Sequence, residues 1–215
     1  MAERDLALED GLEFERNLRW AEALSIYERL ESRPGARSER VDVLLRKANA
    51  LMELGRMDEA RGAFDLCIEE AKAIDEPGLL ARTLVGAGVY AANAGDLSRA
   101  EPFLLTALAL ASRTVGGKDA ATAGWAMLNL GGLYGKTGRL DLAFVTLGKA
   151  RERLGAVGNV VGLAAAWETQ AQLRRAIGDE DRWREDLAEA VLLYKREGLD
   201  EKARRLQALL GRKLV

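Results

Sequence analysis

The chain has 215 residues, of which 48% are hydrophobic and 31% are charged, a balance typical of an ordinary soluble protein. It carries 32 lysines and arginines against 34 aspartates and glutamates, and this formal net charge of -2 argues against a dedicated nucleic-acid binder. The single cysteine excludes an intrachain disulfide, and the lack of histidine removes the commonest general base and the commonest metal ligand.

Apolar residues recur at three- and four-residue steps along most of the chain, which is typical of amphipathic helices. An imperfect first copy of a helical hairpin is expected over residues 4–36, and a lone helix with a basic face near 200–212. Between them, the expected helices pair as 41–54 with 57–74, 78–94 with 97–113, 119–137 with 140–154, and 158–177 with 180–196. No alternating apolar run of strand length occurs, so the sequence predicts an all-α protein.

A glycine returns at near-constant spacing between the two helices of each pair. It stands at Gly55, Gly95, Gly138 and Gly178, with gaps of 40, 43 and 40 residues. A small residue stands seven positions before each glycine, a large apolar one nine after, and a small one twelve after. In that order, the three sets are Ala48, Gly88, Gly131 and Ala171; Phe64, Leu104, Leu147 and Leu187; and Cys67, Ala107, Ala150 and Ala190. A fixed period of this length indicates a repeat architecture.

The residues around the expected helix ends agree with this division. We expect each repeated glycine to end a helix in a left-handed conformation, which other residues adopt at a cost of about 1 kcal/mol. Leu18 takes the place of that glycine in the first copy. Three aspartates stand at expected N-cap positions, namely Asp96, Asp179 and Asp200. Two prolines, Pro34 and Pro77, fall between repeats.

Stacking must stabilise the array, because one hairpin cannot bury its own apolar face. Small residues such as Gly131 and Ala143 are expected to let the two helices of a hairpin approach closely, while Leu140 and Leu147 pack across the neighbouring hairpin. The predicted repeats cover residues 4–36, 38–76, 78–117, 119–157 and 158–197, followed by the capping helix at 200–212. Together they are expected to form one superhelical domain over residues 1–215.

This pattern resembles the tetratricopeptide repeat, best in LNLGGLYGKTGRLDLAFVTLGKA at 128–150 and in ALMELGRMDEARGAF at 50–64. Residues 99–138 are more particularly similar to the longer repeats of the kinesin light chain group, through Ala-Glu-Pro, Gly-Lys-Asp and Asn-Leu…Leu-Tyr-Gly-Lys elements. The resemblance covers nearly the whole chain. It implies a right-handed α-solenoid of about five helical hairpins plus a C-terminal capping helix, with a concave face built from the first helix of each hairpin.

On that concave face, the first helices present side chains suited to a peptide or an amphipathic helix. The expected groove residues are Leu45, Asn49, Met52, Arg82, Val85, Val89, Asn93, Trp125, Leu128, Asn129, Gly132, Glu168, Gln172 and Arg175. Asparagine amides can pair with a peptide backbone, while leucine, valine and tryptophan form pockets for side chains. In similar repeats, an asparagine at the place of Asn129 holds the ligand backbone. A register error would instead turn Val85, Val89 and Leu128 toward the core.

No motif in the sequence indicates catalysis or a cofactor. GGLYGKTG at 131–138 lacks the first glycine that a phosphate loop needs, since Leu130 stands there, and we expect helix packing and a turn instead. Cys67 occupies a slot that alanines fill elsewhere, so a buried small residue is expected rather than a reactive thiol. Carboxylate pairs such as Asp179 and Asp181 are explained by capping or solvation. We therefore expect no enzyme activity, no metal and no cofactor.

The leading hypothesis is a non-catalytic protein-protein interaction scaffold, or adaptor, that binds a peptide or amphipathic helix in its groove. The alternatives are a peptide-sensing regulatory protein acting through a partner, and a homo-oligomeric assembly module in which Trp20 and Trp183 offer open apolar surface. No nucleic-acid or membrane partner is expected. The start MAERDLALED has no signal-peptide core and no stretch approaches the length of a membrane span, so we expect a cytoplasmic protein.

Overall fold

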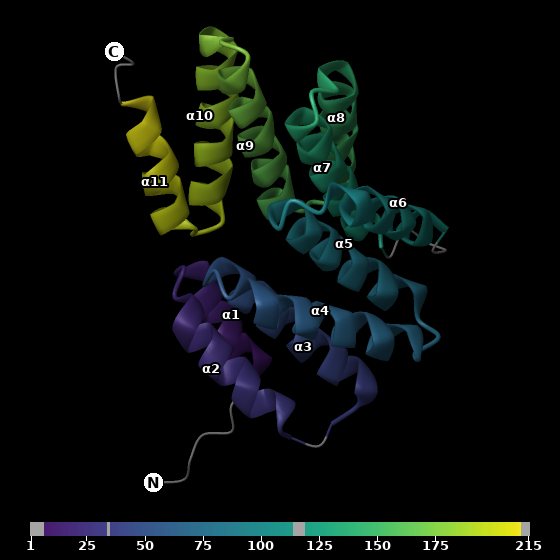
Figure 1. Cartoon of the computed structure of the whole chain (residues 1–215). Helices are drawn as coiled ribbons and strands as arrows, with labels where there is room; N and C mark the ends of the chain where they lie inside the picture. Colours follow the sequence, from purple (N-terminus) through teal and green to yellow (C-terminus); the bar gives the residue numbers. More distant parts are fainter. Residues whose placement is uncertain (1–6, 34, 114–118, 212–215) are drawn as a thin grey trace, which may run out of the picture.

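The computed structural model describes residues 7–33, 35–113 and 119–211. Eleven helices make up all the regular secondary structure of these residues (Figure 1). They are α1 Leu8–Arg16, α2 Trp20–Glu31, α3 Arg37–Glu53, α4 Met57–Lys72, α5 Pro77–Asn93, α6 Leu97–Arg113, α7 Ala120–Lys136, α8 Leu140–Ala156, α9 Val160–Ala176, α10 Glu180–Arg196 and α11 Asp200–Leu210. Pro34 and the Gly-Lys of the Gly-Lys-Asp element lie outside the described residues.

The helices form five hairpins followed by a lone helix, which confirms the predicted all-α solenoid. Each helix packs on the next one along the chain, and α3 also contacts α5, α5 contacts α7 and α7 contacts α9. The first helices of the second to fifth hairpins, α3, α5, α7 and α9, therefore form a continuous inner row, with the second helices outside it. Figure 1 shows the array curving from the N-terminal hairpin round to α11. The helix ends differ from the predicted ones by a few residues, most of all at the start of α3.

The turn glycines hold the left-handed conformation predicted for them. The φ angles of Gly55, Gly95, Gly138 and Gly178 are 73°, 79°, 76° and 78°. A Cβ added at any of them would meet no atom within 4 Å, so the backbone conformation alone favours glycine there. Leu18, at the corresponding place in the first hairpin, also has a positive φ of 56°.

The N-cap prediction is correct for one of the three aspartates. Asp96 Oδ1 accepts a hydrogen bond from the backbone N–H of Arg99 at 3.2 Å, in the first turn of α6. Asp179 precedes α10 but makes no capping bond, because its Oδ2 lies 2.6 Å from Nη1 of Arg174 instead. Asp200 is already the first residue of α11 rather than its cap.

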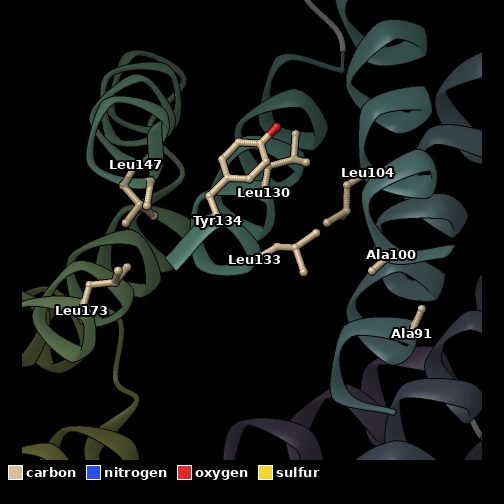
Figure 2. Close-up of a cluster of buried hydrophobic side chains, with 9 residues drawn as sticks. Ala91, Ala100, Leu104, Leu130, Leu133, Tyr134, Leu147 and Leu173 are labelled. Atoms are coloured by element: carbon tan, nitrogen blue, oxygen red, sulfur yellow. The ribbon is translucent and has the colours of Figure 1, made fainter. Parts of the chain in front are cut away.

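Small residues in the inner helices allow close contact with the outer ones, as predicted. A Cβ added at Gly131 would lie 2.6 Å from Cγ of Leu147 and 3.3 Å from the backbone oxygen of Ala143. Leu147 belongs to a buried cluster that joins neighbouring hairpins, and Leu140 packs against it. Figure 2 shows side chains of α7 in the middle of this cluster, with Leu104 on one side and Leu147 on the other.

The C-terminal end of the array is covered, contrary to the prediction for Trp183. Its side chain is only 2% exposed and packs in a cluster with Tyr194, Ala203 and Leu206. Ala203 and Leu206 belong to α11, so the lone helix covers the surface that Trp183 was expected to leave open. Trp20 is half-buried against the cluster of the first two hairpins. Among the described helices, none combines the length and the apolar character needed to cross a membrane.

Candidate functional site

The inner helices α3, α5, α7 and α9 carry every residue predicted for the groove. Half-buried among them are Leu45, Asn49, Met52, Val85, Val89, Trp125, Asn129, Gly132 and Glu168. Exposed are Arg82, Asn93, Gln172 and Arg175. Leu128 is buried, with 6% of its surface exposed. Most of these side chains therefore lie at the border between the core and the inner surface.

A hollow of about 340 Å³ opens on the inner row where α5, α7 and α9 meet. Six of the predicted groove residues line it, namely Val89, Asn93, Leu128, Asn129, Gly132 and Gln172. The other apolar lining residues are Ala92, Leu104, Leu133, Leu140, Leu173 and Ala176. The polar part of the lining consists of two asparagines, a glutamine, Thr169 and Lys136, and none of the described lining residues is acidic.

The polar side chains at the hollow are held by specific contacts. The Nδ2 of Asn129 donates to the backbone oxygen of Trp125, one turn earlier in α7, at 2.8 Å. Asn93 connects three inner helices, since its Nδ2 lies 3.6 Å from Sδ of Met52 and its Oδ1 lies 3.5 Å from Nζ of Lys136. In the described residues, no carboxylate forms an ion pair with Lys136. The hollow is thus apolar inside, with amides and one ammonium group at its edge.

Other predicted groove residues are engaged outside the hollow. Leu45 and Val85 pack against the buried cluster between the second and third hairpins, as the register alternative proposes for Val85. Arg82 forms an ion pair with Asp42, with Nη2 and Oδ1 3.4 Å apart. The Arg175 guanidinium lies over the ring of Trp183, 5.0 Å from its centroid.

Two more of the predicted residues, Glu168 and Trp125, also lie away from the hollow. Glu168 accepts a hydrogen bond from the Tyr194 hydroxyl at 2.8 Å and lies on the side of α9 away from the hollow. Trp125 packs partly buried against the cluster of Leu128 and Leu154. The structure therefore gathers part of the predicted set at the hollow and distributes the rest along the inner helices.

The sequence prediction missed two polar lining residues of the hollow, Lys136 at the end of α7 and Thr169 in the middle of α9. Lys136 lies seven residues after Asn129 and Thr169 three before Gln172, both spacings that keep side chains on one helix face. Extending the predicted face of α7 by one further turn would have found Lys136. Thr169 lies between the predicted residues Glu168 and Gln172 of α9, so its spacing from Gln172 was the signal that could have found it.

Cys67 is fully buried, as predicted. Its Sγ–H donates to the backbone oxygen of Val41 at 3.5 Å and lies 3.6 Å from Oγ1 of Thr83. Burial raises the pKa of the thiol to about 11, so the nucleophilic thiolate is scarce at neutral pH. Within the part of the chain that the structure describes, no group of three or more cysteine, aspartate and glutamate side chains could hold a metal ion. GGLYGKTG lies in the last turns of α7 and the turn after it.

Comparisons with known proteins point to one family. Residues 42–72, which fall in α3 and α4, match the family model described as Tetratricopeptide repeat. No curated protein matches the sequence. Among solved structures, the putative kinesin light chain nearly identical TPR-like repeats of Podosopora anserina have a TM-score of 0.59 and 14% identity, over 89% of this chain and 94% of that one.

Two further structures are similar over most of this chain. The STAND protein PH0952 from Pyrococcus horikoshii, with a tetratricopeptide repeat sensor, has a TM-score of 0.66 and 14% identity, over 93% of this chain and 30% of that one. A Rap protein complexed with Competence and Sporulation Factor has a TM-score of 0.55 and 17% identity, over 94% of this chain and 58% of that one. The chain thus spans less than two thirds of each of these two proteins. Residues 42–72 thus match a tetratricopeptide repeat, and the whole array has the solenoid fold of proteins built from such repeats.

Proposed function

We propose that this protein is a non-catalytic interaction scaffold whose concave face binds a peptide segment of a partner protein. The observation that carries the proposal is the hollow between α5, α7 and α9, with an apolar interior and amides at its edge. An apolar side chain of the peptide would enter the hollow, while the amides of Asn93, Asn129 and Gln172 pair with its backbone. The similar fold of a Rap protein complexed with a factor supports the proposal.

Asn129 is the best placed of these amides. Because its Nδ2 is already bonded to the Trp125 carbonyl, the side chain is fixed and its Oδ1 remains to accept from a peptide N–H. Lys136 adds one positive charge at the same edge. Asn49 and Met52, on α3, would extend the contact toward the second hairpin, because Met52 touches Asn93.

The test uses a random peptide library displayed on phage as the probe and three variants of the full chain. Gly132→Leu should fill the hollow, since a Cβ at this position would meet only Cγ2 of Thr169, at 3.4 Å. Asn129→Ala removes the amide but no bond between helices. Gly62→Leu is the matched control, because Gly62 is an exposed residue of α4 with no atom within 4 Å of an added Cβ.

For a peptide selected on the unmodified chain, we expect Gly132→Leu and Asn129→Ala each to raise Kd by about tenfold or more, equivalent to about 1.4 kcal/mol. Gly62→Leu should leave the Kd unchanged. Isothermal titration would measure all four values, and circular dichroism would confirm that the variants keep their helices. Equal affinities for all four chains would show that the hollow is not part of the binding site.

A further inference from the structure

A second cleft lies between the two ends of the helical array. Its volume is about 980 Å³. One wall comes from α1, the turn after it, the start of α2, and α3; the other comes from α9, the end of α10, the turn after it, and α11 (Figure 1). We propose that this cleft binds a short amphipathic α-helix of a partner protein, with an apolar stripe flanked by basic residues, which bridges the two ends of the array.

The size of the cleft suits a helix. An α-helix is about 10–12 Å wide with its side chains and rises about 5.4 Å per turn, so one turn fills roughly 400–600 Å³. The cleft of about 980 Å³ therefore takes about two turns. The hollow on the inner row, at about 340 Å³, is smaller than a single turn and takes only inserted side chains.

The chemistry of the lining distinguishes the cleft from the hollow. An extended peptide has unpaired backbone N–H and C=O groups that need amide or hydroxyl partners, whereas a helix satisfies its backbone internally. The apolar lining residues are Leu12, Leu18, Trp20, Val161, Leu199 and Leu206. The described lining contains no asparagine, glutamine, serine or threonine, and its one hydroxyl, on Tyr194, already donates to Glu168. Apolar and charged side chains alone therefore face the occupant.

The N-terminal wall carries one engaged carboxylate and two unpaired charges. Glu15 accepts from the Tyr27 hydroxyl at 2.7 Å, and its Oε2 lies 3.1 Å from Nη1 of Arg46. Arg16 and Glu53 are exposed, and neither forms an ion pair with another described residue. This wall therefore offers one free positive and one free negative charge.

The C-terminal wall also has a glutamate that is bonded to a tyrosine hydroxyl and paired with a basic side chain. Glu168 accepts from the Tyr194 hydroxyl at 2.8 Å and lies 3.1 Å from Nζ of Lys202. Arg205 is paired with a carboxylate of its own helix. Glu197 is exposed and forms no ion pair within the described ranges. The unpaired charges of the two walls are therefore two glutamates and one arginine, which favours an occupant with an excess of basic residues.

The test uses a Leu/Lys peptide of about 16 residues as the probe, long enough to form a helix, with leucines at helical spacing. A peptide of the same composition with alternating leucine and lysine, which has no helical apolar stripe, is its control. The cleft variant is Glu53→Lys with Glu197→Lys. A matched variant, Glu69→Lys with Glu189→Lys, makes the same change of net charge at exposed positions outside the cleft.

We expect the helical peptide to bind the unmodified chain and the matched variant with equal Kd, and the cleft variant about tenfold more weakly, since two attractions become repulsions. Amide hydrogen exchange should slow in α1 and α11 when the peptide binds. Equal affinity for the cleft and matched variants, or equal binding of the alternating peptide, would overturn the proposal.

The proposal for the hollow and the proposal for the cleft can be tested separately. Gly132→Leu, which fills the hollow, should leave the Kd of the Leu/Lys peptide unchanged, and the cleft variant should leave the Kd of a peptide selected for the hollow unchanged. If Gly132→Leu weakens the Leu/Lys peptide as strongly as the cleft variant does, the helix occupies the hollow and the cleft proposal is wrong.

Discussion

Two kinds of glycine, selected by different physical constraints, hold this fold together at the scale of the residue. Gly95 and its counterparts at the other turns are required by a positive φ, with open space around the missing Cβ. Gly131, inside α7, is required by the closeness of Leu147. The first kind depends on the local backbone alone, so regular spacing in the sequence is enough to find it. The second kind depends on contact between two helices.

Gly131→Ala should therefore destabilise the protein. A Cβ 2.6 Å from Cγ of Leu147 forces one of the helices to shift, and overpacking of this kind costs about 1–3 kcal/mol. Gly62→Ala is the control: it lies in α4 with open space around it, where alanine stabilises a helix by roughly 0.5–1 kcal/mol relative to glycine. Urea unfolding should move the midpoint down for the first variant and up for the second. A shift in the same direction for both would show that the contact with Leu147 relaxes freely.

At the scale of the helix, the start of α9 is fixed by an asparagine that the sequence pattern did not single out. Asn159 Oδ1 accepts from the backbone N–H of Gly162 at 2.8 Å. Asn159→Ala should lower the free energy of unfolding by about 1 kcal/mol, because an N–H of the first turn loses its partner. Asn159→Ser should retain most of the stability, since serine is also a good N-cap. Thermal unfolding of the three chains checks this, and equal losses for alanine and serine would exclude a capping role.

Helix positions, helix faces and the close contact at the repeated small residue Gly131 could be predicted from the sequence, whereas the contacts of individual polar side chains could not. Asp179 has the position of an N-cap, but its carboxylate turns to Arg174, which also binds Asp186. The same limit applies to the candidate site. The predicted face of the inner helices is occupied by the expected residues, yet the hollow opens near the ends of α5 and α7, beside Asn93 and Lys136. The curvature of the array decides where neighbouring helices separate, and no local pattern encodes it.

At the scale of the whole molecule, contacts run between neighbours along the array. Each helix packs on the next, each inner helix from α3 to α9 also contacts the neighbouring inner helix, and Arg99 of the outer helix α6 pairs with Asp65 of the outer helix α4. The buried cluster around Trp183 is accordingly confined to α9, α10 and α11. Trp183 was expected to be open although a capping helix was predicted at 200–212, because the sequence does not show which side chains that helix covers. An array of this kind should lose structure locally when one end is weakened.

Trp183→Ala should test this locality. Removing a ring that is 2% exposed costs about 3–5 kcal/mol, and the loss falls on the last hairpin and α11. Hydrogen exchange followed by mass spectrometry should show protection lost in α10 and α11 but retained in α3 and α4, whose buried contacts lie around Phe64 and Leu44. Phe64→Ala provides the comparison, because its cluster extends from α3 to α7 and its loss should reduce protection on both sides of α4. If Trp183→Ala reduced protection equally in every helix, the array would unfold as a single cooperative unit, and the locality of its contacts would not be reflected in its stability.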